Sequence, residues 1–167
     1  MPPAFGTSAL PSSAYAGWWQ RVGATILDGL IAVPFLIPGL IVLLAGPTEI
    51  NFRADGIDGP GRYEEPAGGT IALAVLLYLA GVIAYLILYC RRVSRAGSSL
   101  GMSAAGYRIV DARTGANISM GRSIGRLFAR YLSALPCYLG FLWPLWDREH
   151  RTFHDMIAQT RAVRKQP

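Results

Sequence analysis

Two long apolar runs are the feature that most restricts what this chain can fold into. The first covers residues 22–46 and contains one charged side chain, Asp28, whereas the second covers residues 70–90 and contains none. About 20 apolar residues in a helix cross the roughly 30 Å hydrocarbon core of a bilayer. Each run is therefore long enough to span a membrane, and the sequence predicts an integral membrane protein.

Asp28 is an unusual residue for such a run, because a carboxylate inside a bilayer is costly unless it is paired, wetted or neutralised. Arg21 lies seven residues earlier, on nearly the same helix face and about 10 Å nearer the membrane surface. The pair predicts a buried ionic feature. Other expected partners of Asp28 are the hydroxyls of the second span and the arginines further along the chain, namely Tyr78, Tyr85, Arg126 and Arg130.

Composition agrees with a membrane protein of one domain. Apolar residues make up 52% of the chain, the mean hydropathy is +0.33 and the net charge is +6, with an isoelectric point near 9.7. The basic residues stand beside the apolar runs and not in an aromatic-rich patch, so nucleic acid is not the expected partner. Anionic lipid headgroups are the better match for this charge.

The charges of the connecting segments predict an orientation. Residues 47–69 hold five acidic side chains against Arg53 and Arg62, whereas residues 91–126 hold seven arginines against Asp111 alone. Short basic segments stay in the cytoplasm. We therefore expect the acidic segment outside, and the N-terminus and the segment after residue 90 in the cytoplasm.

A third hydrophobic segment, residues 127–146, is interrupted by Pro136, Gly140 and Pro144 and is flanked by basic residues on both sides. A single crossing would conflict with the charge rule. We expect an interfacial helix from about Met120, with arginines at positions 122, 126 and 130 on one stripe. A kinked or re-entrant turn would follow, which is tolerated in a membrane where protein buries the backbone.

Short patterns near the C-terminus predict a small cytoplasmic cap. Residues 107–110 and 160–163 are strand-like and could pair, residues 111–115 are typical of a turn, and Ser119 is a good helix N-cap. The expected fold class is thus all-α: two clear transmembrane helices, a third kinked or re-entrant hydrophobic helix, and a cap with a short β-like pair. Residues 15–163 would form this single domain, between a disordered tail (1–14) and a short tail (164–167).

Several motifs, in this order, resemble the RDD family of bacterial membrane proteins. They are Trp18-Trp19-Gln-Arg21 with Asp28, the stretch from Ser99 to Asp111, the arginine-spaced helix, Gly140 to Asp147, and Arg151-Thr-Phe-His154-Asp155. The resemblance implies that Arg21 and Asp28 are two of the three residues for which the family is named, and that Asp155 is the third, with Asp147 as its rival. Family members often carry Lys where Met102 stands and Gly-Gln-Thr where residues 97–99 stand. An inner-membrane location and an ill-defined role, for which transport has been suggested, are also implied.

Enzymatic chemistry is not expected, because no nucleophile constellation stands out and no cofactor is indicated. His150 and His154 would be one turn apart on a helix, with Asp147 before them, but a structural role outweighs zinc binding. Cys90 and Cys137 lack close-spaced partners and fit buried apolar positions.

Two functions remain open at this stage. The first is a small non-enzymatic, multi-pass inner-membrane protein that serves as an accessory or assembly component of a larger complex or of a homo-oligomer, with Arg21 and Asp28 as a buried packing key. The alternative is an oligomeric transporter in which Asp28 binds a cation or a proton.

Overall fold

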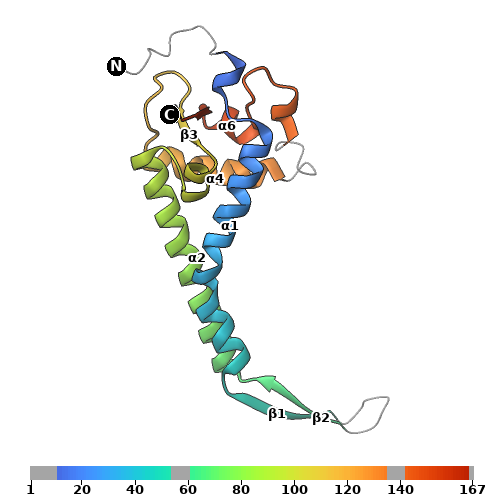
Figure 1. Cartoon of the computed structure of the whole chain (residues 1–167). Helices are drawn as coiled ribbons and strands as arrows, with labels where there is room; N and C mark the ends of the chain where they lie inside the picture. The colour runs from blue at the N-terminus through green and yellow to red at the C-terminus, as the bar shows by residue number, and fades with distance from the viewer. Residues whose placement is uncertain (1–10, 54–60, 135–141, 166–167) are drawn as a thin grey trace. The chain divides into compact units, whose positions relative to one another are not determined.

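The computed structural model describes residues 11–53, 61–134 and 142–165. Contacts divide the chain into two compact units, which are described separately. The terminal unit contains residues 1–30 and 87–167, and the central unit contains residues 31–86. Figure 1 shows the two long helices, α1 (Trp18–Ala45) and α2 (Gly68–Ala96), each of which contributes residues to both units.

Both long helices are long and apolar enough to cross a membrane. In the most apolar 18-residue window of each helix, only 11% of α1 and 6% of α2 is buried. The core helix of a water-soluble protein would bury its apolar side chains, whereas lipid-facing side chains stay uncovered by protein. The expectation of two spans at residues 22–46 and 70–90 is confirmed in length and composition. α1 begins four residues before the expected span and ends one residue short of it, whereas α2 extends beyond the expected span at both ends.

The central unit joins the two helices through a β-hairpin. Strands β1 (Thr48–Arg53) and β2 (Gly61–Pro66) pair antiparallel, with Thr48 opposite Pro66 and Arg53 opposite Gly61. This regular pairing within the acidic segment between the spans was not predicted from the sequence. α1 remains helical through Pro34 and Pro38.

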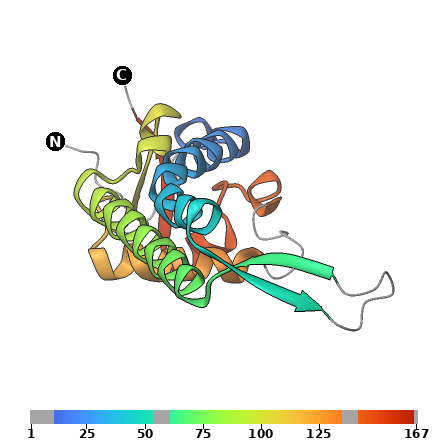
Figure 2. The same ribbon diagram turned by 90° about the horizontal axis from the view of Figure 1, so that it is seen from below.

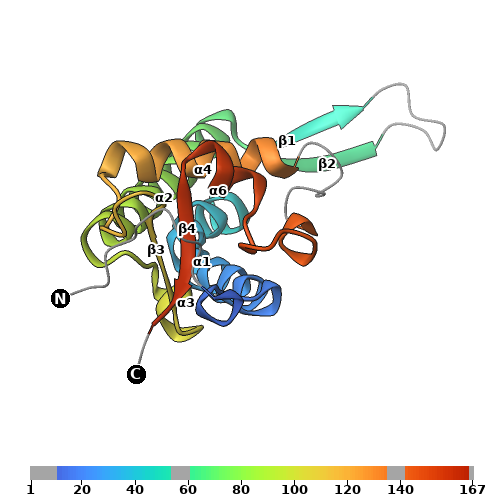
Figure 3. The same ribbon diagram turned by 90° about the horizontal axis from the view of Figure 1, so that it is seen from above.

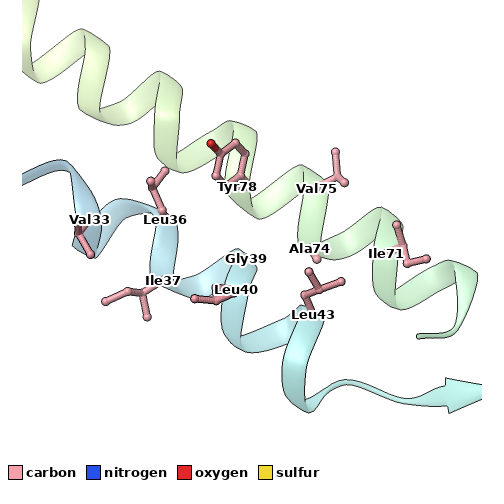
Figure 4. A pocket seen from close by; sticks show the side chains of 10 residues that line it. All are labelled: Val33, Leu36, Ile37, Gly39, Leu40, Leu43, Ile71, Ala74, Val75 and Tyr78. Atoms are coloured by element: carbon pink, nitrogen blue, oxygen red, sulfur yellow. The ribbon is translucent and has the colours of Figure 1, made fainter. Parts of the chain in front are cut away.

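Glycines bring α1 and α2 close together within the central unit. A Cβ atom on Gly81 would lie 1.9 Å from the carbonyl oxygen of Phe35, and one on Gly39 would lie 2.7 Å from that of Ala74. Beside this contact lies an apolar groove of about 550 Å³ (Figure 4). It is lined by Val33, Leu36, Ile37, Gly39, Leu40, Leu43, Ile71, Ala74, Val75 and Tyr78.

The terminal unit is built around a two-stranded antiparallel sheet. Strand β3 (Tyr107–Asp111) pairs with β4 (Thr160–Arg164), side by side in Figure 3. The expected strand pair is therefore confirmed. Tyr15 forms a bridge to Val163 and, with Val110, makes a small apolar core.

Short helices surround this sheet. They are η1 (Ser12–Ala14), α3 (Leu100–Ala104), α4 (Met120–Ala134), η2 (Trp143–Leu145) and α6 (Phe153–Ile157). Figures 2 and 3 show α4 running across the direction of the part of α1 that belongs to this unit. Ser119 accepts a hydrogen bond from the backbone of Arg122, so the predicted N-cap of α4 is confirmed.

The third hydrophobic segment falls only partly on described residues. α4 covers its beginning and η2 part of its end, whereas residues 135–141, and with them Pro136, Cys137 and Gly140, lie outside the described residues. A kinked or re-entrant course therefore stays a prediction. The same holds for the disordered tail expected at residues 1–14, of which residues 1–10 are not described.

Candidate functional site: a buried ionic network

Asp155 occupies the centre of a buried ionic network in the terminal unit. It sits in the first turn of α6, where Thr152 and Asp155 form a capping box, and its exposed fraction is 0%. Arg21 of α1 donates from Nη1 to Oδ2 at 2.5 Å. Arg126 of α4 donates to Oδ1 from Nε at 3.0 Å and from Nη2 at 2.6 Å. One carboxylate thus joins α1, α4 and α6.

Arg21 also donates hydrogen bonds to two backbone carbonyls. Its Nη2 donates to the carbonyl of His150 at 2.6 Å, and its Nε donates to that of Ala16 at 3.3 Å. A guanidinium presents several donors in a fixed fork, and here the fork holds the start of α1 against the segment that leads into α6.

The charges of this network are strongly coupled. Burial by itself raises the pKa of Asp155, but the guanidiniums of Arg126 and Arg21 outweigh it and hold the pKa well below its usual range. Burial lowers the pKa of His154 well below its ordinary value, so this imidazole is neutral at pH 7. The carboxylate therefore stays ionised between two cations.

Asp28 makes a second buried contact, separate from that of Asp155. Its exposed fraction is 6%. Ser99 donates its hydroxyl to Oδ2 at 2.5 Å, and the backbone N–H of Gly101 donates to Oδ1 at 2.8 Å. Ser99 in turn caps α3 by accepting from the backbone of Met102 at 3.1 Å. Asp28 therefore binds the first turn of α3, where unpaired N–H groups favour a negative charge.

The residues expected to form one ionic feature are thus distributed over two contacts. Arg21 binds Asp155, and Asp28 binds α3, so the expected pairing of Arg21 with Asp28 gives way to partners more distant in sequence. Arg126 lies on Asp155, while Arg130 donates to the hydroxyl of Thr25 at 2.9 Å.

Within the central unit, Tyr78 and Tyr85 lie beside α1, and their expected contact with Asp28 stays a prediction. Tyr78 lines the apolar groove, and the ring of Tyr85 lies 5.7 Å from that of Phe35. These contacts arise because both residues sit on the face of α2 that packs beside α1.

Asp147, the rival of Asp155, and His150 have local partners of their own. Asp147 pairs with Arg151, at 2.9 Å between Oδ1 and Nη2, and not with Arg21. α6 begins only at Phe153, so His150 and His154 do not share a helix. His150 has a positive φ of 50°, and its Nδ1 lies 2.9 Å from the carbonyl oxygen of Pro144. Among the described residues, no cluster of three or more metal-ligating side chains is found.

Sequence reasoning did not foresee Ser99 and Gly101 as the contacts of Asp28. A Cβ on Gly101 would lie 2.3 Å from the carbonyl oxygen of Ala24 and 2.8 Å from the Asp28 carboxyl carbon. Only glycine allows α3 to approach α1 this closely. A serine that caps a short helix is a local signal, but it does not indicate which distant carboxylate it faces.

The uncovered apolar helices and the buried ionic network together define a membrane protein with an arginine-rich unit where its two candidate spans begin and end. A family model agrees with this class. The model of the RDD family matches residues 15–159, and the chain belongs to that family.

Proteins of similar sequence occur in several bacteria. A proline-rich antigen homolog of Mycobacterium tuberculosis is 31% identical over 92% of this chain and 65% of its own length. The proline-rich antigen of Mycobacterium leprae is also 31% identical, over 91% and 62%. The uncharacterized protein YxaI of Bacillus subtilis is 30% identical over 90% and 97%. This chain therefore spans just under two thirds of the mycobacterial relatives. No solved structure matches it significantly.

Proposed function

We propose that this protein is a small non-enzymatic component of a larger complex in the bacterial inner membrane, acting in its assembly or as an accessory subunit. The observation that carries the proposal is that the buried charged side chains contact other parts of the same chain. Arg21 and Arg126 both bind Asp155, and Asp28 binds α3, so these groups stabilise packing within the chain. Because these buried charges are engaged by partners within the chain, they support a structural role over a catalytic one.

The surfaces of the long helices support assembly. Large apolar side chains along α1 and α2 remain uncovered, including Leu30, Leu44, Leu76 and Ile83. Lipid can cover this area, and so can the transmembrane helices of another protein or of a second copy, since packing between helices is a main source of association in membranes.

Charge supports an orientation with both termini in the cytoplasm. The arginine-rich segment after α2 and Arg21 at the start of α1 would lie at the inner surface, and the acidic hairpin β1–β2 would lie outside. In this arrangement the third hydrophobic segment returns to the cytoplasmic side, and the terminal unit forms the cytoplasmic cap.

A transporter is the second candidate, and one observation favours it. Asp28 is a buried carboxylate within a candidate span, and intramembrane acids often mark ion or proton pathways.

The substitution Asp28→Asn separates the two functions. An amide retains an oxygen acceptor and removes the charge. For an assembly component, we expect lower cellular abundance and weaker co-purification of partners in mild detergent, with no ion flux by the wild type in proteoliposomes. Asp147→Asn, which changes a carboxylate outside the candidate spans, is the matched control and should leave co-purification unchanged.

The opposite result would establish transport. If the wild type moves ions in response to a pH gradient, and Asp28→Asn abolishes that flux while the protein remains at normal abundance, the assembly proposal is wrong. Identification of the co-purified proteins by mass spectrometry would name the complex.

A further inference from the structure

α4 is an amphipathic helix whose polar face points into the protein. Arg122 forms an ion pair with Asp111, and its Nη2 donates to the carbonyls of Ala158 and Gln159 at 2.8 and 2.9 Å. One turn later Arg126 binds Asp155, and after another turn Arg130 binds Thr25. The arginine stripe of α4 is therefore engaged within the terminal unit.

The apolar face of α4 is left uncovered. Met120, Ile124 and Phe128 recur every four residues along one side, with exposed fractions of 37%, 39% and 65%. A helix on the surface of a water-soluble protein has the opposite arrangement, with its apolar stripe toward the core and its charges outward. α4 instead exposes its apolar side chains and turns its arginines inward, which indicates that its outer face contacts an apolar medium.

The depth of α4 along α1 identifies that medium. The bond from Arg130 to Thr25 places the C-terminal part of α4 beside a point about two turns into α1. Next to Thr25, the outward residues of α1 are Ile26 and Leu27, exposed by 59% and 39%. The exposed apolar face of α4 therefore lies at the same depth along α1 as the exposed apolar side chains of this candidate span.

Charged side chains at the end of α2 indicate where the membrane surface lies. Arg91, Arg92 and Arg95 follow directly after the apolar stretch of α2 and are exposed. Arginines at such a position suit anionic headgroups at the cytoplasmic surface. The uncovered apolar face of α4 and these exposed arginines would then contact successive layers of one leaflet.

We propose that α4 is partly embedded in the inner leaflet, parallel to the membrane surface. Met120, Ile124 and Phe128 contact lipid acyl chains while the arginine face of the helix holds Asp155, Asp111 and Thr25. In this arrangement α4 connects the lipid to the ionic network, because one helix contacts both. The inference rests on the membrane location of α1 and α2 and, for the choice of leaflet, on their proposed orientation, and it is independent of whether the protein assembles a complex or transports an ion.

Site-specific photocrosslinking in phosphatidylglycerol nanodiscs tests this placement. The photoreactive residue p-benzoylphenylalanine would replace Phe128 and, in a second variant, Ile124. Both positions are exposed, so the aromatic replacement should be compatible with folding. Leu76, an exposed residue of α2, is the lipid-facing control, and Arg113, an exposed residue of the turn after β3, is the water-facing control.

We expect the intact mass of the irradiated protein to show lipid adducts at positions 128, 124 and 76 and none at position 113. Lipid adducts at 76 without adducts at 128 and 124 would overturn the proposal, as would a protein–protein crosslink as the main product at those two positions. Absence of adducts at position 76 would show instead that the membrane location itself is wrong, and the proposal would fail with it.

Discussion

At the scale of single residues, the balance of charge around Asp155 governs the terminal unit. One carboxylate faces two guanidiniums, and all three side chains are largely withdrawn from solvent. Removing one partner of a buried ion pair leaves an uncompensated charge, which is far costlier than the loss of a pair at the surface. Stability should therefore be unusually sensitive to the single negative charge of Asp155.

We predict that Asp155→Asn lowers the free energy of unfolding by about 3–5 kcal/mol, because two buried guanidiniums then face a neutral amide. Thermal unfolding of the protein in nanodiscs measures the change. Asp147→Asn is the control, since Asp147 pairs with the more exposed Arg151. This substitution should lower the free energy of unfolding by about 1 kcal/mol or less. Equal losses for the two variants would mean that burial of the Asp155 network does not determine its contribution.

At the scale of elements, the contact between α3 and α1 depends on the absence of a side chain at Gly101. We predict that Gly101→Ala destabilises the protein by about 1–3 kcal/mol, the usual range for overpacking. The added methyl would overlap the backbone of Ala24 and the Asp28 carboxylate, and α3 would have to shift. Thermal unfolding in nanodiscs provides the measurement, and the Ser99–Asp28 hydrogen bond should weaken as well.

Gly125→Ala is a matched control for that prediction. Gly125 lies in α4, and a Cβ there would meet no heavy atom within 4 Å. Alanine is the better helix former by roughly 0.5–1 kcal/mol, so this substitution should be neutral or slightly stabilising. A destabilisation as large as that of Gly101→Ala would show that glycine is required in this unit for a reason other than close packing.

Elements specified by local signals were predictable from the sequence. Two long apolar runs indicated α1 and α2, Ser119 indicated the start of α4, and two short strand-like stretches indicated β3 and β4. α3 has only five residues, too short for a periodic pattern. The β1–β2 hairpin carries many charged and polar residues, and the alternation of Ile50 and Phe52 with polar neighbours in β1 was not recognised as a strand signal.

The sequence predicted which residues belong to the candidate site better than it predicted which of them contact one another. Arg21, Asp28, Asp155 and Arg126 were all named from the sequence, and each is buried. Their partners depend on contacts between residues distant in sequence, from 29 positions for Arg126 with Asp155 to 134 for Arg21 with Asp155. Helical spacing indicates only neighbours on the same helix, so it favoured Arg21 beside Asp28.

At the scale of the whole molecule, the two ends of the candidate spans differ sharply in charge. The hairpin segment between them is acidic, whereas the segments that begin α1 and follow α2 are basic. If both helices cross the bilayer, the hairpin must lie on one side and the two basic segments on the other. The basic side is predicted to be cytoplasmic, because lysine and arginine in short segments are retained there.

Cysteine labelling of intact cells tests this orientation with a matched pair of exposed positions. We predict that Glu65→Cys, in β2, reacts with a membrane-impermeant maleimide from outside the cell. Arg113→Cys, in the turn after β3, should react only after the membrane is permeabilised. The wild type supplies the background from its own cysteines, of which Cys90 is buried. Labelling of Arg113→Cys but not Glu65→Cys in intact cells would reverse the topology, and it would place the Arg21–Asp155 network at the outer surface.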